Sequence, residues 1–543
     1  SAAALGADLQ RWRLGQPVLA MGGGRAYAVS CFLRRYRWAS AAAAVALLAL
    51  VVGIGAALFG LGQARHAQSV AEQRRVQAEN LVEVMLGDLA DNLRPLGKLD
   101  LLETVGEEAM RYLSEADKTD GQAAGAVTRA RALITLGEVY LARSQQQKAS
   151  VAFAQSAQVL DHADTEREER RALDQEKART AYFLGYLAFL AGDYALAERH
   201  WLRRSELSEQ LQQSESNEAT ILESAQALHN LATLALQQGQ TDLALGRFER
   251  SVALKRQAFA LSPSGDDARF ALANSLSSIG TTLQAQGQPG QALRYFQQQV
   301  ALLADVTADD HSISWQDRIG VAKRLQGRLE FDLSGDDDGL LAAAVNHLQA
   351  AAEADPNNRV NARSLLAAQS DLAWTRFLGG EADAGLSYLQ SAIEGYRRPG
   401  ESEFDNPTLS TLVRAYTRLT LIAAVTSNDR YWELATAQLQ MLLEAAPEGW
   451  TESGFGYSEL ACRDLAAALR ANGPDQLQQR RDLAEQALLR LGELAQMTEL
   501  SPISLYALAA KLLGDEEQVD AALRRIESLG YDAAATRRLL TQD

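Results

Sequence analysis

The side chains that could do chemistry are few and scattered. The chain contains six histidines: His66, His162, His200, His229, His311 and His347. None of them forms a His-x-x-x-His or Glu-x-x-His set with its neighbours, the patterns that place two metal ligands on one helix face. The sequence therefore predicts no metal site, and His200 and His229 are interpreted as core or groove residues of helices.

One acidic run could suggest calcium. Asp336, Asp337 and Asp338 stand between Gly335 and Gly339. The run lacks the alternating ligands and the terminal glutamate of an EF-hand loop. We expect a solvated loop or a helix cap here.

No nucleophile or phosphate-binding motif emerges. Val252-Ala253-Leu254-Lys255 matches the Val-Ala-x-Lys pattern of kinases, but it falls in a predicted repeat helix and not on a strand behind a glycine-rich loop. Ser264 and Ser453 lie near glycines without forming a Gly-x-Ser-x-Gly elbow. The sequence thus predicts no catalytic residue, no cofactor and no enzymatic activity for this chain.

The charge and the cysteine content exclude further classes of protein. The formal net charge is −16, and the cations are concentrated before residue 39, so the distal part is acidic and is not expected to bind nucleic acid. The two cysteines, Cys31 and Cys462, lie on opposite sides of the apolar stretch described next. No disulfide or thiolate zinc site is therefore expected.

Residues 39–61 form an uninterrupted apolar stretch without a charge. A helix of this length covers roughly 30 Å, the thickness of a bilayer core, which predicts a transmembrane helix. A cleaved signal peptide and a buried core helix are the alternatives, but a signal h-region is shorter. Arg25, Arg34, Arg35 and Arg37 lie shortly before the stretch. This excess predicts a cytoplasmic N-terminal side.

Small residues recur along this apolar stretch. Gly53, Ala57 and Gly60 share one helix face, and such faces allow two membrane helices to approach closely. Pairing of two chains through this face is a hypothesis, because glycine and alanine are common in such helices in any case.

A phrase with a fixed order recurs four times after residue 121. A small residue (Gly137, Gly185, Ala232, Gly280) is followed by a turn, by an alanine (Ala149, Ala197, Ala244, Ala292) and by an aromatic residue (Phe153, Trp201, Phe248, Phe296). This phrase resembles the tetratricopeptide repeat, which consists of two antiparallel helices. The alanines are 48, 47 and 48 residues apart, against 34 in that repeat. HEAT and armadillo units have a closer period but lack the phrase. Longer helices are therefore expected.

The expected fold is all-α. From the spacing we predict about nine helix pairs over 121–543, forming a tetratricopeptide-like α-solenoid. The phrase blurs after Gly339, where second helices are expected to begin near Leu341, Trp432 and Asp482. Residues 62–120 are predicted to form a stalk and capping helices, with one helix over 64–93 and another over 99–113.

The N-terminal residues resemble the end of a bacterial transmembrane Ser/Thr protein kinase. The resemblance covers 3–20, with the Asp-Leu-x-Arg phrase Asp8, Leu9 and Arg11 and the pair Pro17-Val18, and continues to Arg37-Trp38. Residues 78–113 resemble the segment that precedes tetratricopeptide repeats in these kinases. The resemblance implies that 1–38 are a cytoplasmic juxtamembrane tail and that the kinase domain, with its ATP and Mg, lies upstream of Ser1.

The resemblance also implies a location and a function. The chain would sit in the bacterial inner membrane, with its repeats in the periplasm, where they would bind a protein or peptide and relay a signal to the kinase. A non-signalling envelope scaffold or assembly factor is the alternative. Candidate groove residues come from the first helices: Arg131, Thr135, Glu138, Tyr182, Tyr186, His229, Asn230, Thr233, Asn274 and Ser278.

Overall fold

A computed structural model describes most of the chain. The described residues are 2–22, 24–86, 123–142, 145–163, 170–263, 266–305, 313–356, 358–396, 406–447, 450–452, 454–471 and 473–541. The chain divides into two units, Ser1–Val82 and Glu83–Asp543. Each unit is described by itself.

The first unit begins with short helices. It contains α1 (Ala2–Arg13), η1 (Leu19–Met21), α2 (Arg25–Arg35) and the start of α3 (Arg37–Leu86). The Asp8 carboxylate accepts the backbone N–H groups of Leu19 and Ala20, each at 3.0 Å, and these bonds lower the pKa of Asp8. The acidic residue of the Asp-Leu-x-Arg phrase thus has a local structural role, since it ties η1 to α1.

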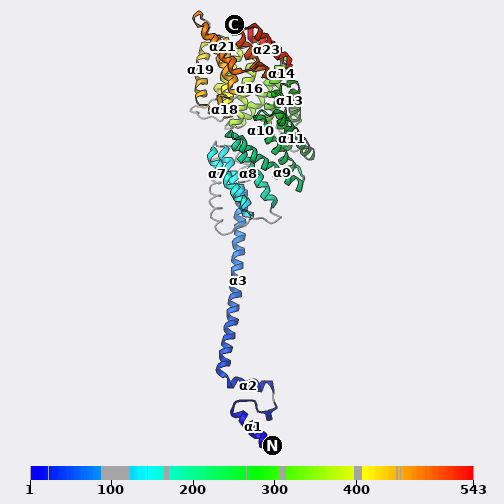
Figure 1. Ribbon diagram of the computed structural model, residues 1–543, viewed down its shortest axis with the longest axis vertical. Helices are drawn as coiled ribbons and strands as arrows, with labels where there is room; N and C mark the ends of the chain where they lie inside the picture. Colours follow the sequence, from blue (N-terminus) through cyan, green and yellow to red (C-terminus); the bar gives the residue numbers. More distant parts are fainter. Residues whose placement is uncertain are drawn as a thin grey trace. The chain divides into compact units, whose positions relative to one another are not determined.

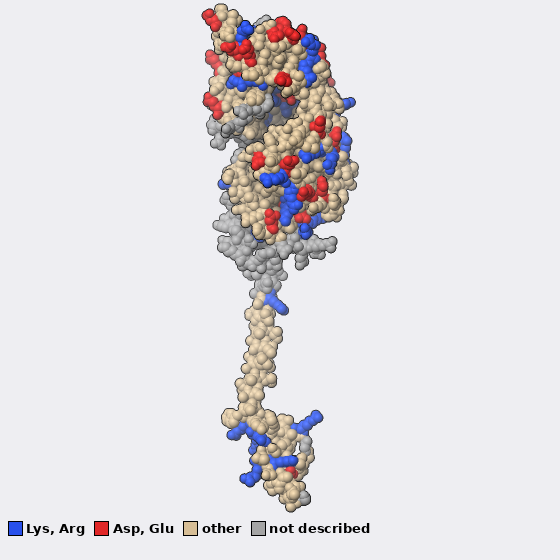
Figure 2. Space-filling model, in the orientation of Figure 1, with Lys and Arg blue, Asp and Glu red and all other residues tan. Residues whose placement is uncertain are grey.

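Helix α3 contains the predicted membrane span. Within the described residues, Arg37–His66 is the one helical stretch long and apolar enough to cross a membrane, judged by length and composition. Its most apolar window is not buried at all, which is unlike a core helix. Figure 2 shows an uncharged length of this stretch, with basic side chains at its ends. A membrane span stays a prediction.

The continuation of α3 agrees with the sequence as far as it is described. The predicted helix over 64–93 is present up to Leu86. Residues 87–93 and the predicted helix over 99–113 lie outside the described residues. Gly53, Ala57 and Gly60 are exposed, and a Cβ added at either glycine would have no neighbour within 4 Å. Their pairing with a second chain also stays a prediction.

The second unit is a series of antiparallel helix pairs (Figure 1). The first helices of the pairs are α6 (Ala123–Ala142), α8 (Arg170–Leu190), α10 (Glu218–Gln237), α12 (Asp266–Ala285), α14 (Ile313–Ser334), α16 (Arg359–Leu378), α18 (Asn406–Val425), α20 (Gly454–Arg470) and α22 (Leu500–Leu513). The second helices are α7 (Gln146–Asp161), α9 (Tyr194–Ser214), α11 (Thr241–Leu261), α13 (Pro289–Ala304), α15 (Leu340–Ala354), α17 (Ala382–Tyr396), α19 (Asp429–Glu444), α21 (Leu477–Leu491) and α23 (Glu516–Ser528). Helix α24 (Ala534–Thr541) ends the series.

The expected all-α solenoid is confirmed. The described residues contain nine helix pairs, and successive first helices begin 46 to 48 residues apart. The long period comes from long helices, as expected: α8, α9 and α11 each have 21 residues. The second helices of the later pairs begin at Leu340, Asp429 and Leu477, within five residues of the predicted starts. Short 3-10 segments η3 (Trp450–Glu452), η4 (Pro474–Gln476) and η5 (Leu494–Gln496) occur in the connections of the last pairs.

The recurring phrase sets the packing within each of the first pairs. At the end of the first helix, Gly192, Gly239 and Gly287 adopt φ values of 77°, 74° and 72°, the left-handed conformation that ends a helix at low cost. The aromatic residue of the second helix then lies over the small residue of the first. Phe153 also joins two pairs, because its ring stacks on Phe183 of the next pair with the ring centroids 4.6 Å apart.

Gly280 offers a test of this packing. A Cβ at Gly280 would lie 2.5 Å from Cε1 of Phe296, which is fully buried. We expect Gly280→Ala to destabilise α12 and α13 by about 1–3 kcal/mol through overpacking. Gly246→Ala in α11 is the matched control, because a Cβ there has no neighbour within 4 Å. It should stabilise by about 0.5–1 kcal/mol through helix propensity. Hydrogen exchange of α12 and α13 measures the first effect and that of α11 the second, and equal signs would contradict the account.

The C-terminal helices pack beside helices from the middle of the unit. The Asp532 N–H donates to the Asp332 carbonyl at 3.0 Å, and a Cβ at Gly287 would lie 3.0 Å from Leu529 Cδ2. One continuous core cluster runs from Ala232 to Leu540. Helix α24 also packs against α16. The C-terminal residues therefore lie against α12, α14 and α16.

Candidate functional site

The helices from α12 to α22 line a partly open cavity of about 660 Å³. Its wall consists mainly of first helices, from Gln284 of α12 through α14, α16, α18 and α20 to Leu505 of α22, together with Tyr531. Charged side chains of both signs line it: Arg324, Arg328, Arg414, Arg418 and Arg490, with Asp332, Asp371, Glu459 and Glu499. The polar wall is unusual for the inside of a folded unit and marks the cavity as the candidate site.

Asp371 is the centre of the charged wall. Its Oδ2 accepts from Arg324 Nη1 at 2.8 Å, and its Oδ1 accepts from Arg418 Nη1 at 2.8 Å. Arg328 Nη1 lies 3.7 Å from Oδ1. Burial would raise the pKa of Asp371, but the three arginines outweigh it and hold that pKa well below the usual range. Asp371 is therefore a buried carboxylate that three guanidinium groups share.

The three residues of this chain of contacts occupy equivalent places in successive pairs. Arg324, Asp371 and Arg418 are each 47 residues apart, which is one repeat. Their helices α14, α16 and α18 are consecutive first helices, so residues one period apart face one another across neighbouring helices. Burial lowers the pKa of Arg418 to about 10, which leaves it charged at neutral pH.

A second acid–base pair lies in the same wall. Arg328 Nε donates to both carboxylate oxygens of Asp332, at 3.1 and 3.2 Å. Burial raises the pKa of Asp332 against the opposing effect of Arg328. Burial would lower the pKa of Arg328, but Asp332 and Asp371 outweigh it and raise that pKa. Arg328 thus stays a cation between two acids.

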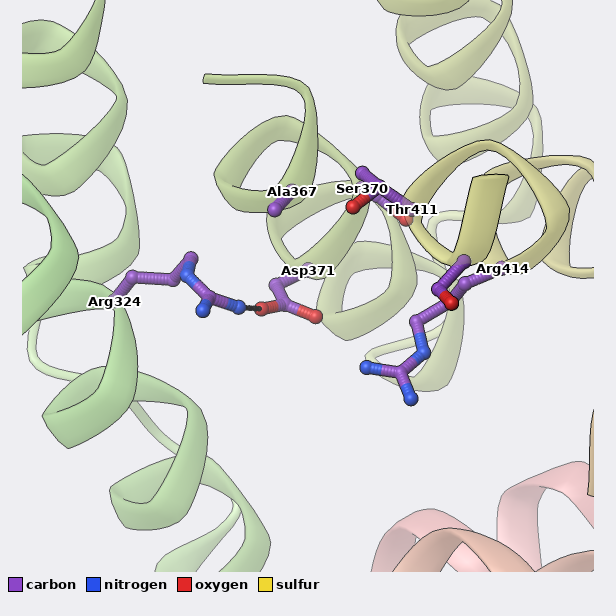
Figure 3. Close-up of a pocket in the computed structure, with 7 residues that line it drawn as sticks. Arg324, Ala367, Ser370, Asp371, Thr411 and Arg414 are labelled. Carbon is purple, nitrogen blue, oxygen red and sulfur yellow. Dashed lines mark hydrogen bonds and ion pairs between the residues drawn. The ribbon is translucent and has the colours of Figure 1, made fainter. Parts of the chain in front are cut away.

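Arg414 belongs to a third pair. Its Nε donates to Glu459 Oε1 at 3.1 Å, and Glu459 Oε2 accepts from Thr417 Oγ1 at 2.5 Å. Figure 3 shows Arg324 of α14 reaching Asp371 of α16, with Arg414 of α18 on the other side of Asp371. Three consecutive first helices thus contribute to one polar surface.

The ten groove residues predicted from the sequence all lie on first helices, but on the first four pairs and not at the cavity. Arg131 pairs with Glu176 at 2.6 Å and Glu138 with Arg179 at 2.7 Å, which ties α6 to α8. Thr135 is buried. Two of the ten are brought together in α8, where the rings of Tyr182 and Tyr186 stack with centroids 6.1 Å apart. These contacts give the residues a role in joining neighbouring pairs.

The remaining predicted groove residues lie on α10 and α12. His229 and Asn230 are buried, and Thr233 and Ser278 are half-buried, with hydroxyls that donate to carbonyls of their own helices. Asn274 is exposed, and its Nδ2 lies 3.5 Å from His229 Nε2. Of this group, Asn274 is the one most accessible to a ligand.

Lys255, the lysine of the kinase-like match, lies in α11, as expected, and its side chain is fully buried. Its Nζ donates to Ser275 Oγ at 2.7 Å and to Gln226 Oε1 at 3.3 Å. Ser275 Oγ lies 3.0 Å from His229 Nδ1. Burial lowers the pKa of Lys255 to about 7 and that of His229 to about 3. Lys255, Ser275 and His229 thus form a buried polar contact between the pair α10–α11 and the first helix, α12, of the next pair.

The other chemical candidates have structural roles as well. Asp337 accepts the Leu341 N–H at 2.8 Å and so caps α15, in agreement with the expected helix cap. Cys31 and Cys462 are free, and burial raises the pKa of the Cys462 thiol, which makes it a poor nucleophile. Among the described residues, no group of three histidine, cysteine or acidic side chains is arranged to hold a metal ion.

Similarities to known proteins occur among solved structures. No protein-family model matches the chain, and no curated protein matches its sequence. Among solved structures, it is similar to a Rap protein complexed with competence and sporulation factor, with 12% identity, 76% of this chain and 99% of that chain covered, and a TM-score of 0.42. It is also similar to the apo form of RapI (8% identity, 74% and 97% covered, TM-score 0.46).

A third similar structure is the apo form of the quorum sensor NprR from B. thuringiensis, with 13% identity, 84% and 99% covered, and a TM-score of 0.38. These identities are too low to carry a function across. By its repeating antiparallel helix pairs, the second unit is a tetratricopeptide-like α-solenoid.

Proposed function

We propose that the second unit binds a protein or peptide segment in the cavity walled by α12 to α22. The observation that carries this proposal is the volume of about 660 Å³ together with its lining of first-helix side chains. Sites of this kind are concave and combine apolar surface with a few placed polar groups. Trp374 and Leu505 supply apolar surface, while the arginines supply charge. The volume fits a few residues of an extended chain.

We further propose that residues 39–61 anchor this binding unit in the bacterial inner membrane, with the solenoid in the periplasm. The apolar part of α3 and the arginines before it support this arrangement. The resemblance of residues 3–20 to a kinase tail supports relay to a Ser/Thr kinase domain encoded upstream. In this proposal the chain itself transfers no phosphate, and ATP and Mg serve the kinase domain only. The coding sequence upstream of Ser1 tests the relay, since a region without kinase motifs would leave only the scaffold function.

Filling the cavity tests the binding site. Ser458 lines the cavity from α20 and is half-buried. We expect Ser458→Trp in the full chain, held in a lipid nanodisc, to weaken binding of peptides selected from a degenerate nonapeptide library by at least tenfold. Ser387→Trp is the control, because Ser387 is exposed on the second helix α17. If both variants bound the selected peptides equally well, the peptide would not bind in this cavity.

A further inference from the structure

A small recess of about 80 Å³ lies in the wall of the cavity. It shares Arg324, Asp371 and Arg414 with the larger cavity and is completed by hydroxyl groups of α16 and α18, among them Ser370 and Ser410 (Figure 3). Its volume is that of a single small polar group. The recess therefore has the size of a subsite for one functional group of a larger ligand.

The charge around the recess is positive. The recess itself is lined by two arginines, Arg324 and Arg414, and by one carboxylate, Asp371, which already accepts hydrogen bonds from Arg324 and Arg418. The lining of the recess therefore carries one more positive than negative side chain, and an anionic group of a ligand would neutralise that surplus.

The hydroxyl groups can add donors to the same place. Ser370 Oγ accepts from Arg418 Nη1 at 2.9 Å, and Ser410 Oγ accepts from Trp450 Nε1 at 3.3 Å. Each hydroxyl thus uses its oxygen as an acceptor and keeps its own proton for donation. The recess presents guanidinium and hydroxyl donors together, which is the complement of an oxyanion.

We propose that this recess binds the carboxylate of an aspartate or glutamate side chain in the peptide ligand, a proposal that rests on the peptide-binding function above. One negative charge neutralises the surplus of one arginine, whereas a phosphate group, with about −1.5 to −2 charges, would leave a buried negative surplus. The recess lies on α14, α16 and α18, midway along a wall that runs from α12 to α22. That place suits a side chain of a passing segment better than a chain end.

Peptide chemistry tests this assignment. The full chain in nanodiscs selects peptides from the nonapeptide library, and titration calorimetry then measures the best binder. We expect the selected peptides to share an acidic residue, and its change to asparagine or glutamine to lower affinity at least tenfold. Amidation of the C-terminus should leave affinity unchanged. Selection without an acidic residue, or loss of binding on amidation, would overturn the assignment.

A double-mutant cycle locates the contact. We expect the affinity for the acidic peptide to fall in Arg414→Met and, as a milder change, in Ser410→Ala. The affinity for the neutral peptide, in which the acidic residue is replaced, should change less than threefold. Arg250→Met on the exposed face of α11 is the matched control. Additive effects of peptide and protein changes would overturn the assignment while leaving peptide binding intact. Failure to select any peptide would overturn the proposed function and this assignment together.

Discussion

Asp371→Asn is expected to destabilise the second unit by about 3–5 kcal/mol, the usual cost of breaking a buried ion pair by removing one partner. Asp371 is buried, and Arg324 and Arg418 each donate to it at 2.8 Å. Asparagine keeps the size and one acceptor oxygen but removes the charge. Three buried guanidinium groups would then lack their shared counterion, and their mutual repulsion would act across α14, α16 and α18.

Urea unfolding followed by tryptophan fluorescence measures this loss. Trp374 lies one turn from Asp371 on α16, and the guanidinium of Arg418 lies 5.5 Å from its ring centre, so its emission reports on the same contact. Asp520→Asn is the control, because Asp520 is exposed on α23. A midpoint shift no larger than that of the control would show that the three arginines tolerate one another without Asp371.

The same residue sets an acid dependence. Because the folded-state pKa of Asp371 lies well below its unfolded value of about 3.9, the unfolded chain binds more protons between these two values. The stabilising contribution is complete above about pH 4 and declines as the pH falls toward the folded-state pKa. The Asp371→Asn protein should lack this part of the acid sensitivity.

Lys255→Met is expected to stabilise the α10–α12 region at pH 7 by a few kcal/mol, on the order of 1.4 kcal/mol for each unit by which the pKa is lowered. The Lys255 side chain is fully buried, and burial together with nearby Arg204 lowers its pKa from 10.5 to about 7. Methionine has a similar length and needs no hydrogen-bond partner. Ser275 retains His229 as a partner, because Ser275 Oγ lies 3.0 Å from His229 Nδ1. The substitution therefore leaves few polar groups without a hydrogen-bond partner.

The pH profile distinguishes this effect from simple packing. Between about pH 7 and 10.5 the unfolded lysine binds a proton that the folded lysine does not, so stability of the natural chain rises with pH over that range. The Lys255→Met protein should lose this rise. Hydrogen exchange of α10 and α12 at pH 7 and pH 9 measures it, with Lys177→Met on α8 as a control for the loss of a lysine outside this contact. A natural chain whose α10–α12 stability is flat over this range would contradict the account.

The order of the helices could be predicted because it depends on local patterns. The small residue at Gly137, Gly185 or Gly280, the left-handed glycine turn and the buried aromatic recur in fixed order, and each acts within one helix pair. The period of about 48 residues follows from the alanines alone and extends to the later pairs. In the pair α14–α15, Gly320 and Gly327 lie against Leu348 and Leu340 instead of aromatic rings, which explains why the phrase is hard to see in that pair.

The place of the candidate site could not be predicted in the same way. The sequence directed attention to Tyr182, His229 and Asn274, in the pairs where the phrase is clearest. The structure encloses its cavity in the later pairs, around Arg324, Asp371 and Arg418. A signal was present, since these three residues are one repeat apart, but a period that places residues side by side says nothing about which of them face an enclosed space.

The sequence by itself thus determined the helix pairs, their length and the apolar stretch at 39–61, because helix formation and packing within a pair depend on residues within one period. Only the tertiary structure decided that α24 packs against α16 and that the Asp532 N–H donates to the Asp332 carbonyl. That closure is the sum of small rotations between successive pairs, and no single repeat encodes the sum. The cavity and its arginine wall exist because those rotations bring the ends of this helix series together.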